Sequence, residues 1–145
     1  MSPRPSEELR RQVIRRAGGR CEYCLIHQED AVARHQIDHV IAEKHGGPTA
    51  LENLALSCVL CLRKGSDLSS IYPDTGEVTE LFNPRTQAWL DHFRIEGVRL
   101  VGASPEGRAT VQLLQLNSHQ RLAERRELNR AGRFSAGDRL KRAIE

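Results

Sequence analysis

The chain has 145 residues, which gives room for one ordinary domain with its own core. Hydrophobic residues make up 39%, charged residues 28% and aromatic residues 4%, and the net charge is +3, as in a globular protein with a modest core. No apolar run approaches the ~20 residues of a membrane span, and the first residues lack the apolar segment of a signal peptide, so we expect no membrane association and a cytoplasmic location.

The positive charge is concentrated at the two ends of the chain. Residues 1–20 carry six arginines against two glutamates, and residues 118–145 carry seven arginines and one lysine against four acidic residues. The guanidinium group of arginine is planar and pairs with phosphate oxygens in a bidentate way. Such basic arms fit a polyanion such as nucleic acid; the alternative is that the arginines lie on solvated helix faces.

The first third of the chain predicts a helix, a strand, a loop, a second strand and a second helix. Ser6 is a helix cap, an apolar residue then recurs every four positions, and Gly18-Gly19 ends the helix. Residues 35–41 alternate with the period of a strand, and the glycines and proline in residues 44–48 predict a loop. Residues 53–57 are long enough for a second strand, and a helix begins around the second cysteine pair.

The second half of the chain predicts a hairpin followed by helices. Pro73-Asp74-Thr75-Gly76 indicates a turn between two short strands. Asn83-Pro84 has the pattern of a helix start, and Trp89, Leu90 and Phe93 would form the buried face of that helix. Ser104-Pro105 predicts another helix start, and an arginine-rich helix is expected from about residue 118 to residue 131.

All four cysteines lie in two Cys-x-x-Cys pairs of identical spacing, Cys21 with Cys24 and Cys58 with Cys61. Two such pairs are typical of a structural Zn²⁺ site, in which each pair presents two sulfurs and the four thiolates close a tetrahedron. The alternatives are two disulfides or a redox pair. A reducing compartment disfavours disulfides, and a redox pair does not predict a second pair with the same spacing.

Asp38, His39 and Asn53 bring a second kind of chemistry to the same segment. Hydrolysis of a phosphodiester needs a base that deprotonates water and a metal that stabilises charge on the phosphate and the leaving oxygen. An imidazole such as His39 suits the base, and the Asp38 carboxylate suits Mg²⁺. Asn53 could accept a hydrogen bond from the imidazole and fix its tautomer. Neighbours on a strand point to opposite faces, so Asp38 and His39 can share a phosphate only if the strand ends or bends there.

These motifs together resemble the HNH endonucleases of the ββα-metal type. The resemblance rests on Cys21-x-x-Cys24, Ile37-Asp38-His39-Val40, His45-Gly46-Gly47, Glu52-Asn53-Leu54, Cys58-x-x-Cys61 and Lys64-Gly65, in the order of that family. It implies that His39 is the general base, that Asp38 is a ligand of a catalytic Mg²⁺ or Mn²⁺, and that Asn53 is the orienting residue. It also implies that the helix with Arg63 and Lys64 lies along DNA, where these side chains neutralise phosphates; a solvated helix face is the alternative.

One position departs from the family pattern. Members of the family carry Asn or His nine residues after the central Asn, as the second protein ligand of the metal, and this chain has Leu62 there. Asp38 alone would hold Mg²⁺ weakly, because the ion then depends on water and the substrate phosphate. His35, on the same predicted strand face as His39, is either a substitute ligand or a half-buried strand histidine.

The sequence therefore predicts an α+β protein with a small zinc-stabilised ββα-metal core and flanking helices. We expect an amphipathic helix in residues 1–20, the core in residues 21–70, a hairpin and helices packed on the core in residues 71–134, and a candidate disordered tail in residues 135–145. The expected function is hydrolysis of DNA with structural Zn²⁺ and catalytic Mg²⁺ or Mn²⁺. Because of Leu62, a catalytically silent DNA-binding or regulatory module is the second hypothesis, and a zinc-stabilised protein-interaction domain is the third.

Overall fold

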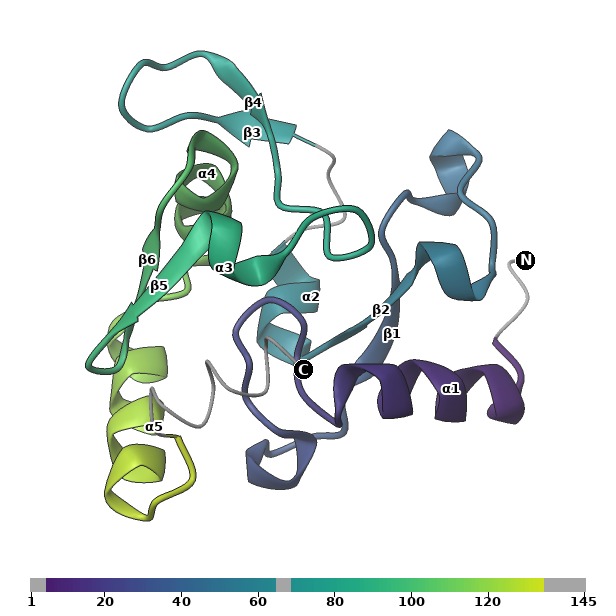
Figure 1. Ribbon diagram of the computed structural model, residues 1–145, viewed down its shortest axis with the longest axis horizontal. Helices are drawn as coiled ribbons and strands as arrows, with labels where there is room; N and C mark the ends of the chain where they lie inside the picture. Colours follow the sequence, from purple (N-terminus) through teal and green to yellow (C-terminus); the bar gives the residue numbers. More distant parts are fainter. Residues whose placement is uncertain (1–4, 65–68, 135–145) are drawn as a thin grey trace. The chain divides into compact units, whose positions relative to one another are not determined.

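The computed structural model describes residues 5–64 and 69–134 (Figure 1). Within these ranges the chain forms five α-helices, short 3₁₀ turns and three two-stranded antiparallel sheets, so the predicted α+β class is confirmed. The elements belong to two compact units, one with residues 5–64 and Asn83–Thr86, the other with Ser69–Phe82 and residues 87–134. The predicted domain boundaries stay predictions, and the predicted tail 135–145 lies outside the described residues.

The first unit opens with α1 (Glu7–Ala17), which begins and ends as predicted. The Ser6 hydroxyl accepts a hydrogen bond from the Leu9 N–H at 3.1 Å, which satisfies one of the free amides at the helix start. Gly18 ends the helix in the left-handed conformation, at φ 64°, where glycine carries no steric penalty. Local capping chemistry therefore fixes both ends of α1.

The sheet of the first unit pairs β1 (Gln36–His39) with β2 (Leu54–Ser57) in antiparallel register, with Asp38 opposite Ala55 and His39 opposite Leu54. Three 3₁₀ turns lie in the connections: η1 (Gln28–Asp30), η2 (Glu43–His45) and η3 (Leu51–Asn53). Helix α2 (Val59–Lys64) follows β2 directly. The predicted order of strand, loop, strand and helix is therefore confirmed.

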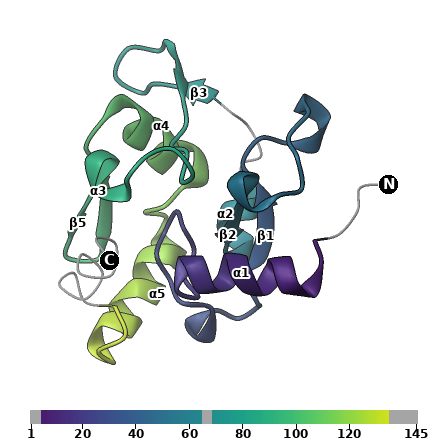
Figure 2. The same cartoon turned by 45° about the vertical axis from the view of Figure 1, so that its right-hand side comes forward.

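Helix α1 packs against β2 of this sheet, and Figure 2 shows the helix beside the strands. Val13, Leu54 and Leu56 are fully buried together, and Leu9 and Ile37 pack at the edge of this cluster. Only a few aliphatic side chains are buried here, each stabilising the fold by ~2 kcal/mol. Because this core is small, further cross-links between α1 and the sheet would add to the stability of the unit.

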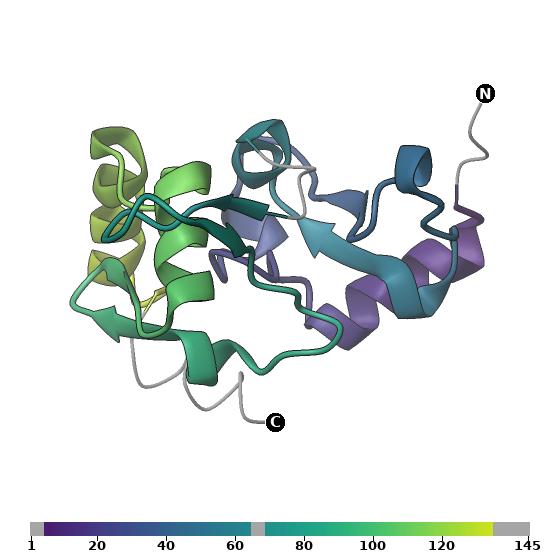
Figure 3. The same ribbon diagram turned by 90° about the horizontal axis from the view of Figure 1, so that it is seen from above.

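The second unit begins with the predicted hairpin, β3 (Ser69–Ile71) and β4 (Val78–Glu80), whose strands are joined by the predicted turn. The two later helices are also confirmed: α4 (Pro105–Leu114) is capped by the Ser104 hydroxyl, and α5 (His119–Arg130) by the Ser118 hydroxyl. Helix α4 packs against β4 and against β6 (Arg99–Gly102), as Figure 3 shows.

The predicted helix start at Asn83-Pro84 is wrong. The Asn83 side chain accepts a hydrogen bond from the Arg85 N–H at 2.8 Å and forms a turn, and helix α3 covers only Trp89–His92. Phe93 is buried as expected but lies in a strand, β5 (Phe93–Glu96), which pairs with β6. The apolar residues read as one helix face therefore divide between a single helical turn and a hairpin.

Several arginines of the predicted basic arms have structural contacts. Arg10 donates to the His35 carbonyl at 3.0 Å and Arg16 to the Leu51 carbonyl at 2.8 Å. In α5, Arg121 is 3% exposed and Arg125 is fully buried. These four arginines therefore have contacts within the protein, which a solely DNA-binding role for the basic arms does not predict.

Candidate functional site

The four cysteines come together in the first unit. Cys21 and Cys24 lie in a turn after α1, while Cys58 and Cys61 lie at the end of β2 and in α2. All four are buried, and their sulfurs lie within 4.8 Å of one another. The 3.7 Å between the sulfurs of Cys24 and Cys58 matches the about 3.8 Å expected for two thiolates on one tetrahedral ion with Zn–S bonds of about 2.3 Å.

None of the four cysteines forms a disulfide bond, so the disulfide alternative does not describe this structure. Backbone amides point at the sulfurs: the Cys24 N–H donates to Cys21 Sγ at 3.5 Å, and the Cys61 N–H to Cys58 Sγ at 3.4 Å. Burial raises the pKa of the Cys21 and Cys61 thiols well above their usual range. A bound divalent cation would offset this cost because it stabilises the thiolate form. The four cysteines therefore form a site that could hold a metal ion.

The two residues between Cys21 and Cys24 connect the cysteine cluster to the sheet. The Glu22 N–H donates to the Leu56 carbonyl at 2.9 Å, and the Leu56 N–H donates to the Glu22 carboxylate at 2.7 Å. The Tyr23 hydroxyl donates a long hydrogen bond, 3.4 Å, to Asp38 on β1. The residues of the first cysteine pair are thus attached to β2 at Leu56 and to β1 at Asp38, a residue of the candidate chemistry.

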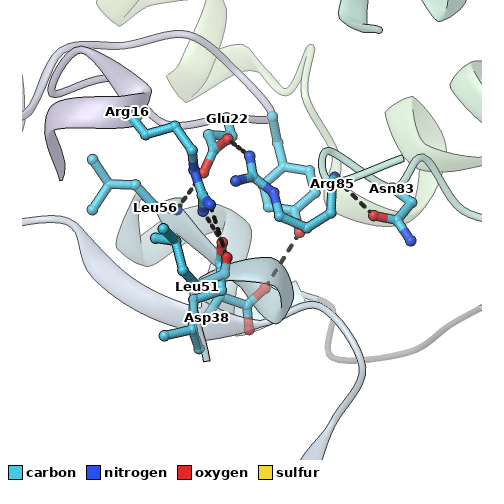
Figure 4. A network of polar contacts seen from close by, with 9 residues as sticks. Arg16, Glu22, Asp38, Leu51, Leu56, Asn83 and Arg85 are labelled. Carbon is cyan, nitrogen blue, oxygen red and sulfur yellow. Dashed lines mark hydrogen bonds and ion pairs between the residues drawn. The ribbon is translucent and has the colours of Figure 1, made fainter. Parts of the chain in front are cut away.

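A buried ion pair extends this network to the Asn83–Thr86 segment of the same unit (Figure 4). Arg85 donates to the Glu22 carboxylate, and both side chains are 12% exposed. Burial raises the pKa of Glu22, an effect that the Arg85 guanidinium opposes. Sequence reasoning missed both residues, because no local pattern pairs positions so far apart in the chain.

We expect Arg85→Ala to destabilise the first unit by about 3 kcal/mol, because it leaves the Glu22 carboxylate buried without its cation. Urea unfolding followed by circular dichroism measures this loss. Arg15→Ala, an exposed arginine in α1, is the matched control and should change little. A Glu22→Gln, Arg85→Ala double variant should recover part of the loss; equal stability of Arg85→Ala and the control would contradict the expectation.

Asp38 and His39 lie at the end of β1, where the chain bends at Val40, as their joint use required. Asp38 is 8% exposed, and burial raises its pKa to about 6. The His39 side chain is 18% exposed, and its Nε2 lies 2.8 Å from the Thr49 hydroxyl and 3.0 Å from a Glu43 carboxylate oxygen. The Asp38 carboxylate accepts a hydrogen bond from Tyr23, whereas the His39 imidazole contacts the loop that follows β1.

The predicted hydrogen bond between Asn53 and the His39 imidazole is wrong. Asn53 is buried, and its Oδ1 accepts from the Ile41 N–H at 2.9 Å. Its Nδ2 donates to the carbonyls of Ile41 at 3.0 Å and Pro48 at 2.9 Å. Both amide hydrogens and the amide oxygen are thus bonded to the backbone of the loop between β1 and β2, so Asn53 closes this loop and makes its hydrogen bonds there rather than to the imidazole.

Neither of the two positions considered for the second catalytic-metal ligand presents a ligand atom at the protein surface. Leu62 lies half-buried in α2 and offers no ligand atom. His35 is fully buried with its Nε2 2.8 Å from the Ile26 carbonyl, so this ring nitrogen is already engaged. In the part of the chain that the structure describes, the cysteine cluster is the one group of three or more potential metal ligands. The side chains of Arg63 and Lys64, predicted to contact DNA, lie outside that part.

Sequence reasoning also missed Glu43 and Thr49, the two groups that contact His39. Both come from the loop after β1, and their approach depends on how that loop folds back. A glutamate four residues after a histidine indicates a contact between the two side chains only where a helical turn is predicted between them.

None of the helices in the described ranges has the length and apolar character that crossing a bilayer requires. Comparison with known families gives a match of residues 21–67 to the HNH endonuclease family. No curated protein and no solved structure matches the chain. The matched segment contains both cysteine pairs, the β1–β2 sheet and the Asp38, His39 and Asn53 positions. The resemblance predicted from the motifs is therefore confirmed for residues 21–67, the segment of this chain that matches the HNH endonuclease family.

Proposed function

We propose that the chain is a divalent-metal-dependent endonuclease that hydrolyses phosphodiester bonds of DNA, with His39 as the general base. The observation that carries this proposal is the position of His39 in the family domain. The imidazole is partly exposed at the end of β1, and Nε2 is engaged by Thr49 and Glu43. Among the described residues, no hydrogen bond reaches Nδ1. This nitrogen is the one that would take a proton from water.

Asp38 is the protein ligand that would hold the catalytic ion. Its carboxylate is a hard oxygen donor suited to Mg²⁺ or Mn²⁺, and its position at the end of β1 agrees with that role. When bound, such an ion supplies positive charge that stabilises the phosphate and the leaving oxygen. Leu62 contributes nothing, so the ion would depend on Asp38, water and the DNA phosphate.

The ion at the four cysteines is proposed to be Zn²⁺, with a structural role. Four thiolates at tetrahedral spacing are typical of closed zinc sites, which leave no position for substrate. Through Glu22 and Tyr23, this site would hold β2 and Asp38 in place. A cytoplasmic location, expected from the sequence, stays a prediction.

DNA is the proposed substrate because the family acts on nucleic acid and the chain carries exposed arginines near its N-terminus. Arg11 and Arg15 are exposed on α1, and Arg63 and Lys64 belong to α2. Phosphate contacts of this kind give an affinity that falls steeply as salt rises. Absence of DNA binding even at low salt would instead favour the hypothesis of a protein-interaction domain.

Nicking of a supercoiled plasmid tests the proposal. Zinc-loaded protein should convert the plasmid to the open form when Mg²⁺ or Mn²⁺ is added and should leave it intact when both are omitted. Omission is preferable to a chelator, because a chelator also removes the metal from the cysteines. Absence of nicking at a protein concentration that fully shifts the plasmid in a gel would overturn the proposal.

Leu62 favours a second candidate function, a DNA-binding module that has lost catalysis. The two candidates predict different results for Leu62→Asn, which supplies an oxygen donor at the position where the family has one. In a weakened enzyme, we expect this change to raise nicking at limiting Mg²⁺ about tenfold, by analogy with the effect of groups that support metal sites. Leu60→Asn, at a half-buried leucine of the same helix, is the matched control. A silent module would show no nicking in any of the three proteins.

A further inference from the structure

The loop between β1 and β2 is closed tightly around the His39 side chain. Asn53, at the end of the loop, bonds the backbone at Ile41, near the start of the loop, and at Pro48, in its middle. Gly47 passes so close to the Ile41 carbonyl that a Cβ there would lie 1.8 Å from its oxygen. Glu43 and Thr49 lie in this closed segment, so their positions relative to the end of β1 are fixed by its backbone.

We propose that Glu43 is a positioning residue for His39, with Thr49 as a second contact. The carboxylate oxygen of Glu43 lies 3.0 Å from Nε2 of the imidazole. An ionised carboxylate only accepts hydrogen bonds, so Nε2 carries the proton and Nδ1 keeps its lone pair. Glu43 thereby selects the tautomer that the general base requires and holds the ring in one orientation.

A purely structural ion pair is the alternative explanation of the same contact. The two side chains are 18% and 31% exposed, and pairs of this kind typically contribute about 0–1 kcal/mol to stability. Removal of the Glu43 carboxylate should therefore leave the protein folded. A positioning role predicts a loss of turnover in a protein of unchanged stability, whereas a structural role predicts no such separation.

The kinetic test rests on the proposed function and uses the zinc-loaded full chain in the plasmid-nicking assay. Glu43→Ala should lower kcat about 10- to 100-fold with little change in KM, as removal of an orienting partner does elsewhere. Glu43→Gln keeps an acceptor oxygen and should lose less. Glu52→Ala, at an exposed glutamate of the neighbouring η3 turn, is the matched control and should keep the wild-type kcat. A wild-type kcat in Glu43→Ala, with His39→Ala inactive, would overturn the positioning role.

A spectroscopic test separates this inference from the question of activity. Long-range ¹H–¹⁵N correlations of histidine-labelled protein, at an alkaline pH where an imidazole is neutral, report which ring nitrogen carries the proton. The His39 signal, identified by its absence in His39→Ala, should show the Nε2–H tautomer in the wild type and a mixture of tautomers in Glu43→Ala. An Nδ1–H tautomer in the wild type, or an unchanged tautomer in Glu43→Ala, would overturn the inference even if the protein nicks DNA.

Discussion

Removal of the metal from the four cysteines is expected to unfold the first unit. Among the described residues, the aliphatic cluster between α1 and the sheet has three fully buried members, Val13, Leu54 and Leu56, whereas the cysteine cluster joins the turn after α1 to the end of β2. Structural zinc sites contribute about 10–16 kcal/mol of binding free energy to small domains, which exceeds the usual stability of a whole domain. Without the ion, the buried sulfurs no longer hold these elements together.

Cys58→Ser tests this expectation at one ligand. The variant should contain less than one zinc per chain and should show hydrogen exchange of the β1–β2 amides at the rate of an unfolded segment. Chelated wild-type protein should behave in the same way and recover on addition of Zn²⁺, whereas Cys58→Ser should recover poorly. Cobalt(II) substitution adds a direct readout, because tetrahedral thiolate coordination has its own visible absorption. Equal exchange protection with and without metal would contradict a structural role for the cluster.

The parts of the fold that could be predicted from the sequence are those with local determinants. The start of α1 follows from the Ser6 cap and its end from Gly18, and the four-cysteine cluster follows from a repeated spacing. Such features depend on neighbours within a few residues, or on one metal ion that gathers identical ligands. The ends of α1 and the cysteine cluster therefore depend little on how the rest of the chain folds.

The hairpin of β5 and β6 was missed because two patterns compete in the same residues. Trp89 and Phe93 are four residues apart, which favours one helix face. Residues 93–96, however, also alternate between buried and more exposed positions, and Gly97 follows at φ 64°, as a tight two-residue hairpin turn requires. Pairing with β6 decides the outcome, and this contact is not visible in either pattern alone.

The candidate site was predicted in its residue types but not in its contacts. Asp38 and His39 lie at the end of a strand as expected, yet the groups that contact the imidazole are Glu43 and Thr49 rather than Asn53. An asparagine can bond an imidazole or a backbone with equal chemistry, and only the path of the loop determines which group lies within reach. Sequence spacing therefore identifies the candidate site residues, whereas their hydrogen-bond partners can be assigned only from the fold.

Replacement of His39 by alanine is expected to lower the rate of metal-dependent nicking by about 10²- to 10⁴-fold, the usual contribution of a general base. DNA affinity should change little, because the imidazole acts on water rather than on the phosphate backbone. His119→Ala, at an exposed histidine at the start of α5, is the matched control and should keep full activity. Zinc content and thermal unfolding of both variants show that the fold is retained.

Addition of imidazole separates a chemical role of His39 from a structural one. If the ring serves as the base, free imidazole should restore part of the activity of His39→Ala, since it can occupy the space of the missing ring and take the proton. A structural role predicts no such rescue, because the free ligand cannot restore the link between β1 and its loop. Unchanged nicking in His39→Ala would exclude His39 as the base, and the water would then have to lose its proton to another group near Asp38.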